Sequence, residues 1–417
     1  MSEKLMNRWL VVVGAILIQL ALGAIYAWSV FTPSLKDAGW STSQTQYVFS
    51  AGLVFFAVVM VLAGRMMPKV GPRKLAVAGG VALGAGYILA GLFNTTSFWP
   101  IFMLIGVIGG SGIGLAYVVP IAVGTRWFPD KKGLIMGLAV AGFGFGAMGW
   151  VKAAGAWGHL IAQYGLSTTF FIYGIAFLIM VCLGGVFMVF PPEGWQPEGW
   201  DPAQAQGACS ATGAVDFTSG EMLRTPQFYM IFFCFVAGGG AGLMSIGLMK
   251  LYPMKALMDS GLTQAAASGI AGTAMAVFFS LANGIGRIAW GALSDLLGRR
   301  CSIVMMLASQ GLVVLFFPMM AGSETLLYLG ATIIGFNFGG NFALFPSITA
   351  DTFGNKFVGQ NYPWVFLAYG VGGTIGPIMG GKLGDMGNFP LAFTICGVAV
   401  VAAAILACFI KPPKGAI

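Results

Sequence analysis

Twelve long apolar segments, separated by short polar stretches, constrain the fold of this chain more than any other feature of its sequence. Each segment approaches or exceeds the roughly 20 residues that a helix needs to cross a bilayer. Only 8% of the 417 residues are charged and 58% are hydrophobic, whereas soluble proteins are about 25% charged. We therefore expect an all-α membrane protein with spans at 9–33, 43–66, 75–94, 98–125, 133–156, 167–190, 226–251, 265–294, 301–321, 325–350, 362–381 and 389–410.

The longest hydrophilic stretch, residues 191–224, divides the twelve segments into two sets of six. It contains the run PPEGWQPEGWDPAQAQ and then a segment rich in Gly, Ser and Thr, a composition typical of a linker. We expect an N-terminal six-helix half at 1–190, a cytoplasmic linker at 191–224 and a C-terminal six-helix half at 225–417.

The Lys and Arg residues of the short loops predict the orientation of the chain. With the N-terminus inside, fifteen of them face the cytoplasm and five face outside, as the positive-inside rule favours. Both termini are then cytoplasmic, and we expect a monomeric, multi-pass protein of the cell inner membrane with the lipid bilayer around it. Because the net charge of +8 lies mostly in these loops, it does not indicate a nucleic-acid partner.

Two loops of the first half have counterparts in the second half. The string GRMMPKVGPRK begins at Gly64 and GALSDLLGRR begins at Gly291, 227 positions later, and a second pair of loops aligns through Phe128 and Phe353, 225 positions apart. A nearly constant offset indicates duplication. Two duplicated six-helix halves are an architecture of membrane transporters, which bind their substrates near the bilayer midplane between the halves.

One cation is expected deep in the membrane. Arg287 lies eight residues before Asp295 in the eighth segment, which places it about 12 Å inside the cytoplasmic end of a helix. None of the twelve segments contains Asp or Glu. Arg287 either links helices through backbone carbonyls and Asn side chains or binds an anion. We favour the anion, because a planar guanidinium matches a carboxylate and the substrate would supply the missing negative charge.

Aromatic and amide side chains from several segments are expected to surround Arg287. Aromatic walls suit a small organic body attached to a carboxylate, and a tyrosine hydroxyl is free to form a hydrogen bond. The predicted substrate-binding residues are Arg287, Asn283, Tyr117, Tyr26, Phe143, Phe338, Phe342, Phe366 and Tyr369, with Asn337 and Asn341 as further amides in the lining.

The loop after the eighth segment carries the pattern GxxxDxxGR[KR] in Gly291, Asp295, Gly298, Arg299 and Arg300. It resembles the loop signature of the major facilitator superfamily, and the earlier copy has Pro68 where the acid belongs. The resemblance implies twelve transmembrane helices in two pseudo-symmetric halves and a gating role for the complete copy of the loop.

Further strings, including LGAIYAWSVF, RWFPDKKGLIMG, GEMLRTPQF, NFGGNFALFPS and GQNYPWVF, resemble the oxalate/formate antiporter branch, which lies close to the monocarboxylate transporters. The resemblance implies that Arg287 binds the substrate carboxylate and that Tyr26, Tyr117, Phe143, Phe338 and Phe342 occupy the positions of the family's aromatic cage.

Two departures from that branch bear on the substrate. Oxalate antiporters have a lysine in span eleven where this chain has Tyr369, and one buried cation balances a monoanion but leaves a dianion half uncompensated. Animal monocarboxylate transporters have a proton-carrying aspartate where this chain has Asn283, which cannot titrate. We expect proton-coupled symport of lactate, pyruvate or a similar monocarboxylate. An oxalate/formate-type exchanger is the alternative.

Other function classes find less support in the residues. A single histidine and the lack of a CxxC pair argue against a metal site, and no cofactor is expected. The absence of His, Asp and Glu from the apolar cores disfavours a membrane enzyme, and the duplicated halves disfavour a passive channel. Gly144, Gly146 and Gly149 match GxGxxG but lie inside an apolar span, where they predict close helix packing rather than a dinucleotide site.

Four of the five lysines expected on the outer side bear on how an anion would approach. Lys152 and Lys382 occupy matching positions near the outer ends of spans five and eleven. They either extend to the membrane interface or line a vestibule that attracts anions, and Lys250 and Lys255 add to the positive field there.

Overall fold

The computed structural model describes residues 6–93, 97–128, 132–155, 157–192, 195–197, 216–354 and 357–411, without the side chains of Thr125, residues 132–139, Asp295 and residues 358–359. Within these ranges every regular element is helical, and ten helical spans are long and apolar enough to cross a membrane. They fall on ten of the twelve predicted segments, and α7 (Lys132–Ala154) and α17 (Val358–Asp385) occupy the other two. The prediction of an all-α membrane protein is confirmed.

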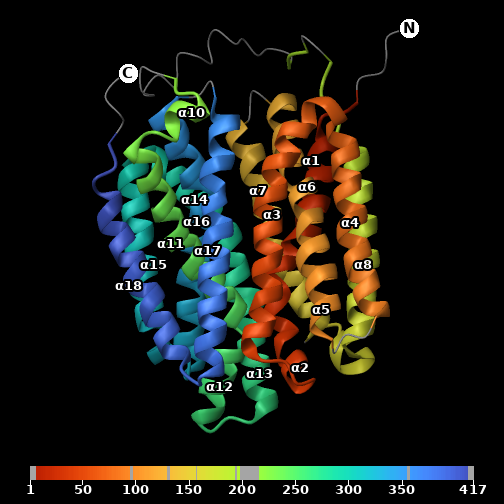
Figure 1. Cartoon of the computed structure of the whole chain (residues 1–417), viewed down its shortest axis with the longest axis vertical. Helices are drawn as coiled ribbons and strands as arrows, with labels where there is room; N and C mark the ends of the chain where they lie inside the picture. The colour runs from red at the N-terminus through yellow and green to blue at the C-terminus, as the bar shows by residue number, and fades with distance from the viewer. Residues whose placement is uncertain are drawn as a thin grey trace.

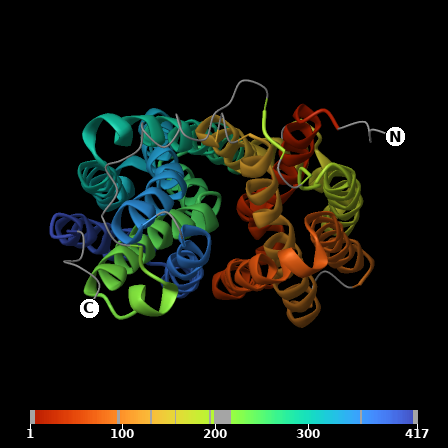
Figure 2. The same cartoon turned by 90° about the horizontal axis from the view of Figure 1, so that it is seen from above.

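Helices α1 to α8 form one bundle, here called the N-terminal bundle (Figures 1 and 2, red to yellow). Its main contacts pair α4 with α8, α3 with α6, and α1 with α7. Its elements are α1 (Trp9–Leu22), the 3₁₀ segment η1 (Gly23–Val30), α2 (Thr32–Asp37), α3 (Thr42–Val70), α4 (Pro72–Leu92), α5 (Phe98–Ile101), the π-helical segment η2 (Phe102–Gly109), α6 (Gly110–Trp127), α7 and α8 (Leu160–Val186).

Helices α10 to α18 form the C-terminal bundle (Figure 1, green to blue), in which α11 packs on α17, α14 on α16, and α15 on α18. Its elements are α10 (Ser219–Met222), α11 (Pro226–Leu248), α12 (Leu251–Asp259), α13 (Gln264–Thr273), the π-helical segment η3 (Ala274–Phe279), α14 (Ser280–Leu297), α15 (Arg299–Met320), α16 (Glu324–Phe353), α17 and α18 (Phe389–Ala407). The two ends of the molecule are called the α10 end and the α12 end below, after the short helices that Figure 1 places there.

The outer face of α8 has the apolar surface expected of a helix in lipid. Ile172, Ile175, Ile179, Leu183 and Val186 follow one another at intervals of three and four residues and are 36–55% exposed. That spacing places them on one side of the helix. An exposed apolar stripe of this kind is stable in a bilayer and unfavourable in water.

The duplicated loops have the same backbone shape. Gly71, between α3 and α4, has φ 89° and ψ 150°, and Gly298, between α14 and α15, has φ 84° and ψ 147°. A positive φ is unfavourable for a residue with a Cβ, so both turns favour glycine. The two glycines are 227 positions apart, which is the offset of the repeated sequence, and the helix pairs around them correspond.

The bundles meet along α3 and α17 and along α7 and α14. At Gly144 a Cβ would lie 3.0 Å from Gly284 Cα in the opposite bundle, so a side chain there would push α7 away from α14. A Cβ at Gly146 would clash with Leu20 O inside the N-terminal bundle. The prediction of close helix packing is correct for these two glycines, whereas Gly149 has open space beside it.

Candidate substrate-binding site

Arg287 lies on α14 where that helix faces the N-terminal bundle, and its side chain is 3% exposed. Its Nε donates to Asn283 Oδ1 at 3.1 Å, and its Nη1 donates to Val140 O of α7 at 3.1 Å. Nη2 has no hydrogen-bond partner. Two of the five guanidinium N–H groups are therefore used, and one of them joins the two bundles.

Aromatic rings enclose the guanidinium. Its Cζ lies 4.1 Å from the ring centroid of Phe342 and 5.7 Å from that of Phe143, distances at which a ring face attracts a cation. Tyr26 packs edge-on against Phe143 at 5.0 Å between centroids, and its hydroxyl is hydrogen-bonded to the Tyr369 hydroxyl at 3.1 Å. The hydroxyls of Tyr26 and Tyr117 also interact electrostatically with Arg287.

The nine residues predicted to bind substrate form one connected cluster. Tyr26, Tyr117 and Phe143 come from η1, α6 and α7, and the other six come from α14, α16 and α17. Ring contacts join Tyr117 to Phe143 (5.3 Å), Phe338 to Phe342 (5.3 Å) and Phe366 to Tyr369 (5.1 Å). All nine are at most 8% exposed. The cluster is thus buried between the bundles, and its nine residues together are called the chamber below.

The chamber is short of hydrogen-bond acceptors and of negative charge. Asn283 Nδ2 and Arg287 Nη2 are buried donors without partners, and no carboxylate of the described residues forms an ion pair with Arg287. An uncompensated buried charge destabilises a protein by about 3–5 kcal/mol. A small anion accepting from both groups would remove this deficit.

Two of the predicted amides lie elsewhere. Asn337 Oδ1 accepts from Trp290 Nε1 at 3.1 Å, and its Nδ2 donates to Ser309 in α15. Asn341 donates to two carbonyls of its own helix. The expectation that they line the Arg287 site is therefore wrong, because they lie one residue before Phe338 and Phe342 and thus about 100° around α16.

One ring at the centre of the chamber is absent from the sequence prediction. Phe56 of α3 is 1% exposed and contacts Tyr117 (4.9 Å), Tyr369 (5.7 Å) and Phe366 (5.8 Å). It links rings of both bundles. No local signal distinguishes Phe56 from the many other aromatic residues in the apolar segments.

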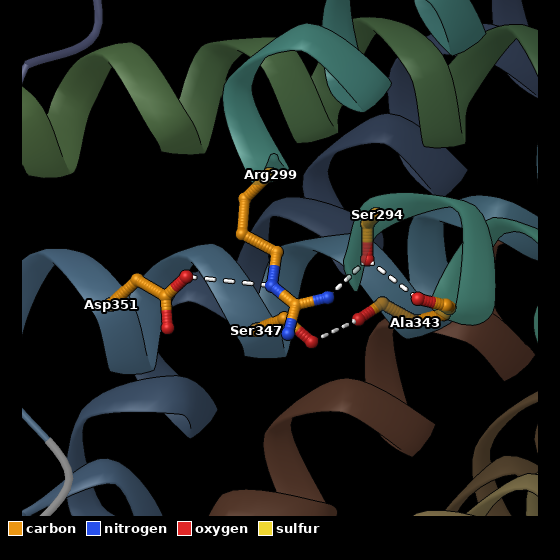
Figure 3. Close-up of polar contacts among 6 residues, drawn as sticks. Ser294, Arg299, Ala343, Ser347 and Asp351 are labelled. Atoms are coloured by element: carbon orange, nitrogen blue, oxygen red, sulfur yellow. Dashed lines mark hydrogen bonds and ion pairs between the residues drawn. The ribbon is translucent and has the colours of Figure 1, made fainter. Parts of the chain in front are cut away.

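The signature loop lies at the α10 end, away from the chamber. Figure 3 shows Arg299 between the last turn of α14 and α16. Its Nε lies 3.4 Å from Asp351 Oδ2, and its Nη1 donates to Ser294 Oγ. Ser294 Oγ in turn donates to Gly291 O, within α14, at 2.7 Å, and Arg300 is exposed. The side chain of Asp295 lies outside the described part of the structure.

At the α12 end a carboxylate of one bundle caps a helix of the other. Asp385 at the end of α17 accepts from the backbone N–H groups of Thr42 (2.5 Å) and Ser43 (2.9 Å) at the start of α3. Gln46 Nε2 donates across the same interface to Gly247 O at 3.2 Å. The bundles are therefore joined at the α12 end by contacts of α3 with α17 and α11, which a separation of the bundles would break.

Comparison with known proteins identifies the family of this arrangement. The family model for the Major Facilitator Superfamily matches residues 9–283 and 262–416. The chain belongs to this superfamily. Relatives within the superfamily include the Oxalate:formate antiporter of Oxalobacter formigenes, which is 28% identical over 98% of this chain and 93% of its own length. An uncharacterized MFS-type transporter of Escherichia coli (strain K12) is 28% identical over 88% of this chain and 86% of its own length.

A more distant superfamily relative is Monocarboxylate transporter 13 of Rattus norvegicus, 23% identical over 94% of this chain and 86% of its own length. The predictions of family and of fold class are confirmed. As a superfamily member the chain is a multi-pass membrane transporter and not an enzyme.

Proposed function

We propose that this transporter carries small monocarboxylates such as lactate or pyruvate, with Arg287 binding the carboxylate in the chamber. The observation that carries the proposal is the unused Nη2 of a buried guanidinium that has no acid partner among the described residues. The contact of Arg287 with Val140 also links α14 to α7, whereas the contact with Asn283 lies within α14. Nη2 remains for a carboxylate, which accepts hydrogen bonds from a guanidinium.

The charge balance of the chamber supports a monoanion. Arg287 supplies one positive charge, and Tyr369 contributes a hydroxyl that is hydrogen-bonded to Tyr26. A dianion would leave one charge uncompensated in a medium of low dielectric constant, which is costly. Relatives named as an Oxalate:formate antiporter and as monocarboxylate transporters support a small carboxylate as the substrate class.

The location of Arg287 supports alternating access. The guanidinium bonds to α7 in one bundle from α14 in the other, so it lies where two bodies that rock against each other would expose it to either side. The N-terminal half 1–190 and the C-terminal half 225–417 would be these bodies, and 191–224 their linker. By the positive-inside rule the α10 end faces the cytoplasm of an inner membrane, with both termini on that side.

We propose proton symport as the coupling mode, with the substrate carboxylate at Arg287 as the titrating group because Asn283 cannot titrate. Exchange of one carboxylate for another is the second candidate, and the similarity to the Oxalate:formate antiporter over 98% of this chain favours it. In proteoliposomes, an imposed pH gradient accelerates lactate uptake if symport is correct. If exchange is correct, internal lactate accelerates uptake strongly and the pH gradient does little.

The binding role of Arg287 is tested in the same vesicles. We expect Arg287→Ala to abolish lactate uptake while the folded protein is retained, and Arg287→Lys to keep little uptake because the bidentate fork is lost. Arg126→Ala is the matched control, since Arg126 lies at the end of α6 and its guanidinium contacts the ring of Phe190. Full uptake by Arg287→Ala would refute the proposal.

A further inference from the structure

Two buried lysines from opposite bundles donate hydrogen bonds to the same short helix, α13, at the α12 end. Lys152 of α7 donates to Thr273 Oγ1 at 3.1 Å, across the interface between the bundles. Lys250, which follows α11, donates to Ser268 Oγ at 2.8 Å and also to Ser268 O. Ser268 and Thr273 both lie on α13, about 8 Å apart along the helix axis. A Cβ at Gly272 would lie 3.2 Å from Lys250 Nζ, so the Lys250 ammonium reaches the position next to Thr273, to which Lys152 donates.

The burial of these lysines excludes the simpler explanation that they extend to the membrane interface. Lys152 and Lys250 are each 8% exposed. Lys382, which occupies the position of the second half that corresponds to Lys152, is exposed. It borders a surface hollow lined by Thr374, Ile378 and Met386. Lys152 and Lys250 are therefore turned into the protein, whereas Lys382 follows the pattern of a lysine at a membrane surface.

The pair has no negative partner. No ion pair joins either lysine to a carboxylate of the described residues, and the two ammonium groups interact with each other across the bundle interface. The carboxylate of Glu324, at the start of α16, is hydrogen-bonded to Tyr328, and Tyr328 is hydrogen-bonded to Thr273. Lys255 on α12 is exposed and paired with Asp259 at 3.0 Å, so its charge is already balanced.

We propose that Lys152 and Lys250 form a second binding site for the small carboxylate, between Arg287 and the solution at the α12 end. The site rests on the proposed function, since it takes the same anion. An ammonium group has three N–H donors, so Lys152 keeps two and Lys250 keeps one beyond the bonds described. These donors suit the two oxygens of one carboxylate, which would also offset the repulsion between the cations.

The site is assembled by closure of the α12 end. Lys152 belongs to the N-terminal bundle, and Lys250 and its helix α13 belong to the C-terminal bundle. Separation of the bundles at this end would part the two lysines. Ser268 and Thr273 remain partly exposed, so this part of α13 borders the solution from which an anion would arrive. The pair would therefore bind substrate as the α12 end closes.

The test measures the KM for L-lactate separately at the two sides of the membrane, in proteoliposomes of uniform orientation. The variants are Lys152→Met and Lys250→Met. Each variant should raise the KM for L-lactate at the α12 side about fivefold or more, because one cation is lost from a partly buried site. The KM at the α10 side and the maximal rate should stay within about twofold of wild type. Lys255→Met is the matched control, because it removes a paired, exposed cation from the same end.

An unchanged KM in both variants, or an equal increase at both sides, would overturn the lysine site. Two other results would instead show that the proposed function is wrong. They are the absence of lactate transport in wild-type vesicles and normal lactate uptake by Arg287→Ala. In that case the lysine site is tested by the effect of L-lactate on the Tm of the purified protein. A lactate-induced rise in Tm that persists in Arg287→Ala and is lost when both lysines are replaced supports the site, and no lactate-induced rise in wild type overturns it.

Discussion

Replacement of Asp385 by Asn should weaken the closure of the α12 end by a predictable amount. The carboxylate accepts two backbone N–H groups of α3 at 2.5 and 2.9 Å, and hydrogen bonds to charged groups contribute about 1.5–3 kcal/mol each. Asn retains one acceptor oxygen and loses the charge that favours a helix N-terminus. We expect the closed conformation to lose about 1–2 kcal/mol, which raises the ratio of open to closed molecules by about 5- to 30-fold.

The opening is measured as a distance between two spin labels, one on each bundle. Cysteines at Ala38, after α2, and at Leu391, in α18, place exposed labels at the α12 end of a chain from which the six native cysteines are removed. The long-distance population should grow in Asp385→Asn. Asp259→Asn is the control, because its carboxylate lies at the same end and pairs with exposed Lys255. Identical distance distributions in wild type and Asp385→Asn would refute the reasoning.

Three further substitutions follow from the structure. Asn283→Asp places a carboxylate where Asn283 Oδ1 now accepts from Arg287 Nε. This variant should bind lactate about tenfold or more weakly at neutral pH, and its affinity should recover as the new acid is protonated. Titration calorimetry at several pH values measures both effects. Tyr369→Lys adds a second cation to the chamber and should raise the ratio of oxalate to lactate uptake; an unchanged ratio contradicts the charge-balance argument. Asp351→Asn removes one partner of Arg299, in an ion pair whose side chains are 26% and 41% exposed, and should change the Tm by no more than a few degrees. A larger loss would mean that the loop depends on this pair.

Much of the fold is predictable because lipid imposes a simple rule on the sequence. Each predicted segment carries a long helix, since backbone groups in a bilayer must be paired within their own segment. The shared backbone shape of Gly71 and Gly298 also follows from the sequence repeat. Arg287 is identifiable for the same reason, because a cation in an apolar segment without an acid is conspicuous in the sequence alone.

The contacts between bundles are not predictable in this way. Val140 contributes a backbone carbonyl, which any residue possesses, and Phe56 is one aromatic among many. Asn337 and Phe338 are neighbours in the chain but lie about 100° apart around the axis of α16, so their side chains face different helices. Lys152 and Lys382 occupy matching positions, yet the structure buries the first and exposes the second, because Lys152 meets Thr273 of α13 in the opposite bundle.

The attraction between the guanidinium of Arg287 and the charge of a carboxylate is tested most directly by comparing the binding of L-lactate with that of lactamide. These ligands are close in size and differ in charge. Titration calorimetry of purified wild type should give an affinity for lactate about a hundredfold or more above that for lactamide, and in Arg287→Gln the ratio should fall to near one. A preference for lactate that survives in Arg287→Gln would show that Arg287 does not bind the carboxylate.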